Sequence, residues 1–346
     1  MTEIAVPLVS VVMPVRNEEE FIRKTISSLL MNDYAPNKLE VLVVDGMSDD
    51  GTRDIVREMA RSDARLKLLD NPRRVTPVAM NIGIQNSCGE IIVIMGGHAT
   101  VAPDFISQSV RVLNEHPDAC CAGGIMETIG MHYTGSVIAT AMSSPFGVGG
   151  SNFRVRKTAG YVTMVPFGAH RRRIFDKIGM FDEELVRNQD DDFIQRMIEA
   201  GEKQYMSPAI KSQYFCRASF RKLFRQYFQY GFWRIRTIQK RGKPATIRQI
   251  IPLTFVLGWI MLCLAALLWS PFQIVLGCYG ALYIIILFTG AYFVSCDKGW
   301  KIGVLVPVAF ILMHFGYGFG SLKGIWSWII FKGRFVSSGA AFKMSR

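Results

Sequence analysis

The sequence predicts an α/β domain with a Rossmann-like mixed sheet, followed by transmembrane helices. In the N-terminal part, short apolar runs alternate with segments of helical periodicity, which is typical of strands joined by crossover helices. In the C-terminal part, residues 250–269, 272–293 and 302–320 form three uncharged stretches, each close to the ~20 residues that cross a bilayer. The mean hydropathy of +0.21 over 346 residues fits a chain with such a membrane part.

The expected elements of the first domain follow one another regularly. A strand at 8–15 (LVSVVMPV) precedes a helix from about 18 to 30, whose apolar residues recur at helical spacing. A second strand ends at Asp45. We then expect a helix at 52–61, a strand at 66–69, a helix at 77–86, a strand at 90–95, a helix at 103–114, strands at 120–125 and 162–167, a helix at 172–178 and a helix starting near Asp191. The Gly- and Ser-rich stretch 143–151 is predicted to be a binding loop or lid.

Asp45 ends an apolar run, VLVVDGMSDDGT (41–52), at a polar turn. A strand this apolar is buried on both faces of a parallel sheet, and ligands of such sheets bind at the carboxyl ends of the strands. A carboxylate accepts hydrogen bonds from the N–H of a base or from ribose hydroxyls, whereas it repels a phosphate. We therefore predict that Asp45 contacts a nucleotide. The alternative is that Asp45 only caps the helix after Gly51, although residues 48–50 are nearer to that helix.

The net charge of +12 has a definite place in the chain. No Asp or Glu occurs from Lys203 to Cys296, while basic residues crowd just before the first apolar stretch. They are Arg217, Arg221, Lys222, Arg225, Arg234, Arg236, Lys240, Arg241, Lys243 and Arg248. This pattern places that side of the membrane in the cytoplasm and indicates contact with anionic lipids rather than nucleic acid.

Residues 217–241 are predicted to form an amphipathic helix on the bilayer surface, because aromatic and aliphatic residues recur at threes and fours between the basic ones. The alternative is a helix that packs against a protein core. Residues 1–9 carry Glu3 and lead into a strand rather than a signal segment, so we expect the first domain in the cytoplasm. The seven cysteines show no C-x-x-C spacing and are expected to be reduced packing residues.

Four segments together resemble the inverting family 2 glycosyltransferases, which have a GT-A fold, and they occur in the family's order. PVRNEE (14–19) resembles the first-strand turn, VVDGMSDDGT (43–52) the donor-base segment, MGGH (95–98) the position of the metal-binding D-x-D, and NQDDD (188–192) the catalytic-base segment. Segments 70–84, 143–154 and 181–191 look most like the succinoglycan-type membrane glucosyltransferases. The resemblance implies a nucleotide sugar, UDP-glucose above all, as donor, and a polyprenyl-diphosphate-linked saccharide as acceptor. It also implies a role in exopolysaccharide biosynthesis beside other polysaccharide-assembly enzymes.

The resemblance assigns the catalytic base to Asp190. Inversion at the anomeric carbon needs one base that takes the proton of the attacking acceptor hydroxyl, and a positioned carboxylate suits this task. Asp191 and Asp192 should disfavour ionisation of all three carboxyl groups, and Asp191 is expected near the acceptor. The alternative is an acidic helix start that the helix dipole favours.

The expected metal site departs from the family's pattern. Gly96 stands where the first Asp of D-x-D is expected, and His98 occupies the last position. A divalent cation, Mn²⁺ or Mg²⁺, would offset the charge of the leaving diphosphate, and His98 suits Mn²⁺ better. Three interpretations remain open at this point: weaker metal use with Gly96 leaving room for ribose, partial replacement of the metal by Arg73, Arg74 or Arg172, or an inactive paralogue that binds a nucleotide.

Smaller assignments follow by position. Pro14, Arg16 and Glu18 resemble the family's cradle for base and ribose, and Asn81 matches a position near the donor. Gln226 lies where processive relatives carry Q-x-x-R-W, but the motif is only partial, so we expect transfer of a single sugar. A rival function is a polyprenyl-phosphate sugar synthase of the same fold.

The predicted organisation is a cytoplasmic GT-A domain at 1–216, a basic interfacial region at 217–248, transmembrane stretches within 249–322 and a basic tail at 323–346, all in a multi-pass protein of the cytoplasmic membrane. Three complete spans would put the basic tail outside, against the positive-inside pattern. The third stretch, which contains Pro and Gly, is the candidate for an irregular or re-entrant segment.

Overall fold

The computed structural model describes residues 6–148, 158–216, 219–244 and 246–332. Its contacts divide the chain into two compact units. The first, here called the α/β unit, comprises Met1–Glu127 and Asn152–Phe215, and the second, the helical unit, comprises Thr128–Ser151 and Cys216–Arg346. Part of the predicted loop at 143–151 and the segment up to residue 157 lie outside the described residues.

The α/β unit is built on a mixed sheet with the strand order β3-β2-β1-β4-β8-β6-β9-β5, to which β7 adds by pairing with β9. Strands β1 to β4 are parallel, and β8 runs antiparallel to β4. Their bounds are β1 Val9–Val15, β2 Leu39–Asp45, β3 Leu66–Asp70, β4 Ile91–Ile94, β5 Ala99–Val101, β6 Ala119–Ile129, β7 Gly160–Val162, β8 Ala169–Arg171 and β9 Lys203–Phe215. Every residue of β2 is buried, as its uninterrupted apolar run predicts.

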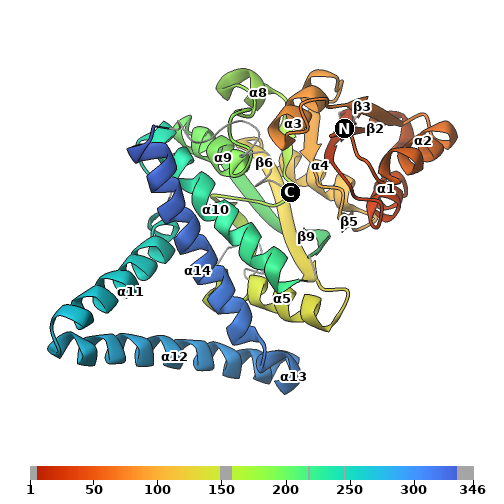
Figure 1. Ribbon diagram of the computed structural model, residues 1–346. Coiled ribbons are helices and arrows are strands. Elements are labelled where there is room, and N and C mark those ends of the chain that lie inside the picture. The colour runs from red at the N-terminus through yellow and green to blue at the C-terminus, as the bar shows by residue number, and fades with distance from the viewer. Residues whose placement is uncertain (1–5, 149–157, 217–218, 245, 333–346) are drawn as a thin grey trace. The chain divides into compact units, whose positions relative to one another are not determined.

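Helices cover both faces of this sheet (Figure 1). One face packs on α1 (Ile22–Leu30), α2 (Thr52–Ser62) and α4 (Phe105–Glu115) through alternate strand residues such as Val41 and Val43. The other face packs on α3 (Thr76–Gln85), α8 (Arg173–Ile178) and α9 (Gln189–Glu199) through the intervening residues, such as Leu42 and Val44. The strand period of two residues thus divides one apolar run between two cores.

The predicted strand at 162–167 is wrong except for its first residue. Strand β7 ends at Val162, and the chain turns before β8 begins at Ala169. Pro166 has no N–H to donate to a neighbouring strand, and Phe167 adopts a left-handed backbone with φ 45°. These two residues make the turn.

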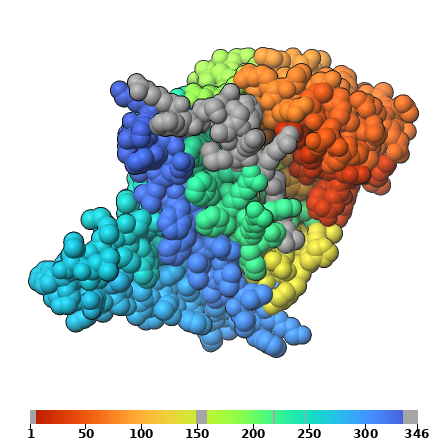
Figure 2. All heavy atoms as spheres, in the orientation of Figure 1, coloured from red at the N-terminus to blue at the C-terminus, as the bar shows by residue number. Residues whose placement is uncertain are grey.

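The helical unit consists of α5 (Tyr133–Ser143), α6 (Pro145–Val148), α10 (Phe220–Arg241), α11 (Ile251–Leu268), α12 (Pro271–Lys298), α13 (Trp300–Gly303) and α14 (Val306–Gly324), which a π-helix extends over Ile325–Ile330. Three of its segments are long and apolar enough to cross a membrane: Ile251–Leu268, Pro271–Lys298 and Trp300–Ile330. Figure 2 shows side chains of α11 and α12 uncovered on the face in view, and Leu268 and Phe288 are 88% and 67% exposed. Such uncovered apolar surface indicates association with a membrane.

Candidate active site

The carboxyl ends of β1, β2 and β4 lie at one edge of the sheet, because β1 pairs with both neighbours in parallel. This edge brings together Arg16, which follows β1, Asp45, which ends β2, and Gly96, which follows β4. It is the edge at which parallel α/β sheets bind ligands. Residues that the sequence places in three separate segments are therefore neighbours in space.

Asp45 is fully buried and held by partners from the chain itself. Its Oδ1 accepts hydrogen bonds from the Ser48 N–H at 2.8 Å and from the Arg53 guanidinium at 2.7 Å. Its Oδ2 accepts one from the Ser48 hydroxyl, while Arg53 also pairs with Asp70 at 2.7 Å. A nucleotide could reach this carboxylate only after one of these side chains has moved aside.

The turn after Asp45 is tied to the turn after β1. Asn17 and Asp49 exchange two hydrogen bonds, of 2.6 and 3.1 Å, and the Glu18 N–H donates to the Thr52 hydroxyl. Asp50 accepts from the Thr52 N–H at 3.0 Å, so Asp50 satisfies the start of α2 and the capping alternative for Asp45 is wrong. Burial raises the pKa of Asp50, but the hydrogen bonds from Thr52 and Glu19 outweigh it and leave the pKa below its usual value.

The carboxylate of Glu18 contacts the imidazole ring of His98. The His98 Nδ1 is 2.9 Å from the Glu18 carboxylate, and the His98 ring packs edge-on against Tyr214 with 5.0 Å between ring centroids. Because an ionised carboxylate only accepts, Nδ1 is the donor, and in the neutral form of the ring Nε2 is the nitrogen with the lone pair. This carboxylate–histidine arrangement is the one that orients metal-binding histidines.

Gly96 faces open space. A Cβ at this position would meet only the Cε1 atom of His98, at 3.9 Å, whereas a Cβ on Gly97 would lie 2.9 Å from Val15. Among the residues that the structure describes, no group of three or more His, Cys, Asp and Glu side chains could hold a metal ion. The described residues therefore offer an oriented imidazole on His98 with open space at Gly96 beside it, but no cluster of three protein ligands.

Arg16 is half-buried, and part of the hydrogen-bonding capacity of its guanidinium is not used by the residues that the structure describes. Its Nε and Nη2 are buried and have no hydrogen-bond partner among these residues. Its Cβ would be 3.3 Å from a Cβ on Gly46, which places its stem against the turn after β2. Buried charged donors are normally paired, so this guanidinium is available to an anion or to a base.

Asn81 is buried on α3 and uses its amide within the protein. Its Nδ2 donates to the Phe181 carbonyl and to Glu183, each at 3.0 Å, and its Oδ1 accepts from the Phe181 N–H at 3.0 Å. Glu183 also pairs with Arg73. Asn81 thus holds the segment that leads to Asp190, and both of its N–H groups are occupied. A donor contact by Asn81 stays a prediction.

The three neighbouring aspartates at the start of α9 have different surroundings. Asp190 is exposed, and its carboxylate accepts from the Asp191 N–H at 3.0 Å. Asp192 is fully buried and pairs with Arg196 at 3.0 Å, and Arg196 also binds the carbonyls of Ile178 and Met180. Asp192 therefore supports the fold, which leaves Asp190 and the half-buried Asp191 as candidates for chemistry.

Left-handed backbone occurs in the same segments. The non-glycine residues with φ near 60° include Asn17, Met47 and Asn188, which lie in the segments 14–19, 43–52 and 188–192, and Arg74, which lies in the segment 70–84. Such conformations cost free energy and concentrate at functional sites. Arg172, one proposed substitute for a metal, instead binds the carbonyls of Ser87 and Gly89 before β4, at the opposite edge of the sheet from His98.

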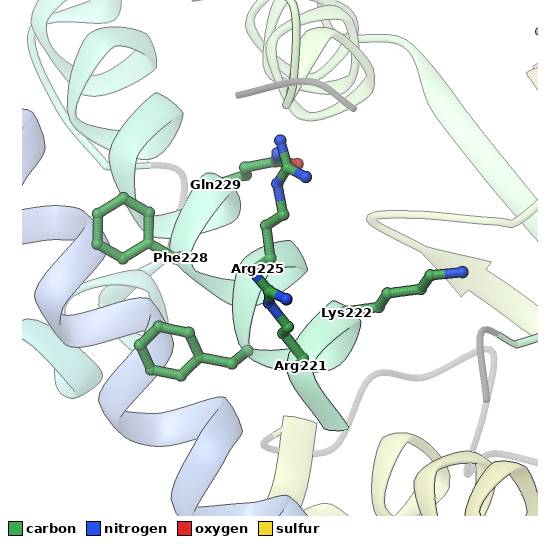
Figure 3. Close-up of a pocket in the computed structure, with 6 residues that line it drawn as sticks. Arg221, Lys222, Arg225, Phe228 and Gln229 are labelled. Carbon is green, nitrogen blue, oxygen red and sulfur yellow. The ribbon is translucent and has the colours of Figure 1, made fainter. Parts of the chain in front are cut away.

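The helical unit contains a second candidate feature on α10. A cavity of about 710 Å³ is lined by Arg221, Lys222, Phe224, Arg225, Phe228 and Gln229 (Figure 3). Guanidinium and ammonium groups beside aromatic rings suit a phosphate that is attached to an apolar chain. Gln226 does not line this cavity, and its Nε2 donates to the Tyr230 hydroxyl at 2.8 Å.

The sequence did not point to Arg53 or to Glu18 as the partners of Asp45 and His98. The contact between Glu18 and His98 depends on the adjacency of β1 and β4, which no local pattern reports, whereas Arg53 lies eight residues after Asp45 on the helix that follows β2. The pair Asp192–Arg196 has the helical spacing of four residues and could have been predicted from the sequence.

Comparison with known proteins identifies the family. Residues 10–179 match the model for glycosyl transferase family 2. The dolichyl N-acetyl-alpha-D-glucosaminyl phosphate 3-beta-D-2,3-diacetamido-2,3-dideoxy-beta-D-glucuronosyltransferase of Methanococcus voltae is 30% identical over 230 residues, which cover 64% of this chain and 71% of that protein. The chain is a family 2 glycosyltransferase. Succinoglycan biosynthesis protein ExoA of Rhizobium meliloti is a further relative of this glycosyltransferase, 29% identical over 250 residues that cover 70% of this chain and 74% of ExoA.

The glycosyltransferase also resembles solved structures. The mannosyltransferase PcManGT from Pyrobaculum calidifontis, solved with GDP-Man and Mn²⁺, superimposes with a TM-score of 0.63 at 18% identity, covering 94% of this chain and 88% of that one. This likeness shows the fold. The predictions of a GT-A fold, of the family and of a glycosyltransferase are confirmed.

Proposed function

We propose that this glycosyltransferase moves a sugar, in the first instance glucose from UDP-glucose, onto a polyprenyl-diphosphate-linked saccharide in exopolysaccharide biosynthesis. The observation that carries the proposal is the edge of the sheet at which the unpaired guanidinium of Arg16, the carboxylate of Asp45 and the prepared His98 meet. A nucleoside diphosphate has matching parts: a base with N–H donors and two anionic phosphates. The name of the relative ExoA refers to succinoglycan biosynthesis, and that of the M. voltae transferase to a sugar linked to dolichyl phosphate.

In the proposed reaction, Asp190 accepts the proton of the acceptor hydroxyl while the hydroxyl oxygen attacks the anomeric carbon. The bond between this carbon and the donor phosphate breaks, and its electron pair leaves with the nucleoside diphosphate. The attack comes from the side opposite the leaving group, so the configuration inverts. An exposed carboxylate at a helix start can reach a large lipid-linked acceptor, which a buried one such as Asp192 cannot.

His98 is the residue that fits a divalent cation, because Glu18 orients its ring through Nδ1 and Nε2 is then the nitrogen that a neutral imidazole offers to a metal. When bound with the donor, such a cation would offset the negative charge that develops on the leaving diphosphate. Arg16 supplies positive charge from the protein at the same edge of the sheet. These groups bind and orient the donor, whereas Asp190 moves the proton.

The cavity on α10 supports a lipid-linked acceptor. Arg221, Lys222 and Arg225 offer cations for the acceptor's phosphates, and Phe224 and Phe228 offer an apolar wall for its hydrocarbon chain (Figure 3). The name of the M. voltae relative describes an acceptor with a lipid phosphate, so a monophosphate-linked and a diphosphate-linked saccharide are the two acceptors to compare.

The test is the transfer of labelled glucose to the lipid fraction in membranes that contain wild type, Asp190→Asn or Asp176→Asn. Asp176 is an exposed carboxylate on α8 and serves as the matched control. We expect Asp190→Asn to lose about 10²- to 10⁴-fold in turnover, the usual contribution of a general base, while the control keeps its activity. Equal turnover of the three proteins would refute the role of Asp190.

The analysis of the product separates the rival functions. Two sugars on the lipid support transfer to a saccharide, and one sugar on a lipid phosphate would show a polyprenyl-phosphate sugar synthase. Binding of UDP-glucose without any transfer by wild type would show an inactive paralogue.

A further inference from the structure

Helix α14 differs from the other two apolar segments. In its most apolar window, 39% of the residues of Trp300–Ile330 are buried inside the protein, compared with 11% for Ile251–Leu268 and 17% for Pro271–Lys298. A helix that faces lipid on most sides stays uncovered by protein, as α11 and α12 are. Other elements of the protein therefore cover part of the surface of α14.

The covering element is α10, which contacts the backbone of α14 at regular intervals. A Cβ on Gly316 would lie 3.0 Å from the carbonyl oxygen of Phe224, one on Gly320 2.0 Å from that of Phe228, and one on Gly324 2.7 Å from that of Phe232. Both sets of residues advance by four, so the two helices run side by side in the same direction over more than two turns.

Further contacts continue this pairing toward the C-terminal end. Gln239 donates to the Trp328 carbonyl at 3.2 Å, and the Arg236 guanidinium lies over the Trp328 ring at 5.0 Å from its centroid. In the middle, the Arg234 Nε donates to the Tyr317 hydroxyl at 3.2 Å. The depth of α14 in a membrane is therefore tied to the depth of α10.

Helix α10 carries many cations and no acidic residue. Arg221, Lys222, Arg225, Lys240 and Arg241 lie at both of its ends, and Arg234 and Arg236 lie between them. A helix of 22 residues with cations at both ends and two more in its C-terminal half has no uncharged stretch long enough to cross the hydrocarbon core, although it suits the headgroup region. The part of α14 that pairs with α10 must lie there too. The remaining part, Val306 to Phe315, is only about half of the ~20 residues that a span needs.

The N-terminal half of the third apolar segment, Trp300–Ile330, is bound by segments that precede the first apolar helix. Tyr133 of α5 donates to the carbonyl of Lys301 on α13, and the Nε2 of His314, midway along α14, donates to the Phe146 carbonyl of α6 at 2.9 Å. Helices α5, α6 and α10 all come before α11 in the chain. The third apolar segment is thus held near its start, at its middle and along α10 by segments from the side of the membrane on which α11 begins.

We infer that α11 and α12 are the membrane spans, and that α14 lies with α10 as a two-helix platform on the anionic surface of the side where α11 begins. The chain crosses outward through α11 and returns through α12, so Asp297, Lys298 and Lys301 lie in water at the start of α14. The C-terminal tail then lies on the same side as the basic residues of α10. The conflict between three spans and a basic tail disappears, because the positive-inside rule holds for every basic cluster.

Reporter fusions to the full chain test this topology without reference to catalysis. Green fluorescent protein after Arg346 should fluoresce and alkaline phosphatase there should be inactive, whereas phosphatase inserted after Ser270, between α11 and α12, should be active. An active phosphatase at the C-terminus would overturn the inference, as would an inactive one at Ser270.

Depth measurements provide an independent test. Nitroxide labels are placed on single cysteines at Phe319 of α14 and Ile285 of α12, which are 41% and 60% exposed, in a chain whose native cysteines are replaced by alanine. Relaxation by a water-soluble nickel chelate and by oxygen reports the depth of each label in anionic vesicles. We expect the label at 319 at headgroup level and the label at 285 deep in the hydrocarbon. Equal depths would overturn the inference.

Discussion

Arg16 shows most directly how a single residue of this site departs from the rules of a stable core. A buried guanidinium that has no partner for Nε and Nη2 costs free energy of folding unless a ligand supplies the acceptors. Hydrogen bonds from Asn17 to Asp49 and from Glu18 to Thr52 join the turns on either side of Arg16. The arginine is therefore held in place although the described residues provide no acceptor for its Nε and Nη2. This is the arrangement expected of a residue kept for binding.

Replacement of Arg16 by Met should therefore separate stability from binding. We expect the free energy of unfolding to stay the same or to rise by about 1 kcal/mol, since an unsatisfied buried charge is removed, while the affinity for UDP falls about tenfold or more. Denaturant unfolding and isothermal titration with UDP measure the two quantities. Arg23→Met is the control, because the Arg23–Glu58 pair is about half exposed and should contribute little to either. Unchanged UDP affinity in Arg16→Met would contradict the assignment.

At Gly96, by contrast, a carboxylate that the family's pattern predicts is absent. The open space around it would accept a larger side chain, as only His98 lies within 4 Å of a Cβ, and its backbone is not left-handed. Gly96→Asp should thus fold normally and add a carboxylate beside His98, raising Mn²⁺ affinity in the presence of UDP by about tenfold, or 1.4 kcal/mol. Electron paramagnetic resonance of free Mn²⁺ gives the affinity. Gly96→Asn has the same shape without the charge, and equal affinities of the two variants would show that no metal binds beside His98.

At the scale of elements, the sequence predicts those parts whose periodicity is local. Strands β1 to β4 and helices α1 to α4 can be predicted from the sequence, because the spacing of apolar residues within each segment shows which of its side chains are buried. Strand β9 is not, because KQYMSPAIKSQYF includes two lysines and a proline and shows no regular alternation. It is a strand because β6, β7 and β5 pair with it. The contact between Glu18 and His98 cannot be predicted from local sequence for the same reason, since it requires that β1 and β4 are neighbours in the sheet.

Strand β8 is where the parallel half of the sheet meets an antiparallel strand, and it buries a histidine. His170 pairs with Ile92 of β4 and Cys121 of β6, and its ring packs on Phe175 and Phe193. Burial lowers the pKa of His170 to about 4, against some compensation from backbone hydrogen bonds. The imidazole is thus neutral in the folded protein at neutral pH.

This strand should limit stability in acid. The unfolded chain binds a proton on His170 near pH 6.5 and the folded chain only near pH 4, so stability is lost as pH falls through this window, by up to about 3 kcal/mol. His170→Leu removes this loss, and its free energy of unfolding should fall less steeply between pH 6.5 and 4. Denaturant titrations at several pH values measure the slope. His116→Leu, which replaces a half-buried histidine of the same unit, is the control and should retain the wild-type slope.

At the scale of the whole molecule, each of the two compact units is made of two separate stretches of the sequence. The predicted cytoplasmic domain ends at residue 216, and the contacts do change unit at that point, between Phe215 and Cys216. However, Thr128–Ser151 belongs to the helical unit although it lies between two strands of the sheet. The Gly- and Ser-rich composition of 143–151 predicts a loop at the end of this segment, whereas the structure has the short helix α6 at Pro145–Val148; nothing in the composition indicates that the segment belongs to the helical unit.

Phe146 is the clearest contact of this segment. Its ring lies 6.2 Å from that of Phe293 on α12 and 6.3 Å from that of Phe310 on α14, and its carbonyl accepts from His314. A fragment of residues 1–216 lacks all three partners, so Phe146 and the apolar side of α5 are left uncovered. We expect this fragment to aggregate even though the sheet is complete up to β9.

Substitution of Phe146 by Ala should therefore make the fragment of residues 1–216 more soluble but make the full chain less stable. In the fragment, Phe146→Ala should raise the soluble fraction and lower the binding of a hydrophobic dye, because it removes exposed apolar surface. In the full chain in detergent, it should lower the free energy of unfolding by about 3 kcal/mol, because it empties a site between α12 and α14. Met31→Ala, at a methionine of the α/β unit that is 79% exposed, should alter neither quantity appreciably. A Phe146→Ala fragment as insoluble as its parent would mean that some other segment makes the α/β unit depend on the helical unit.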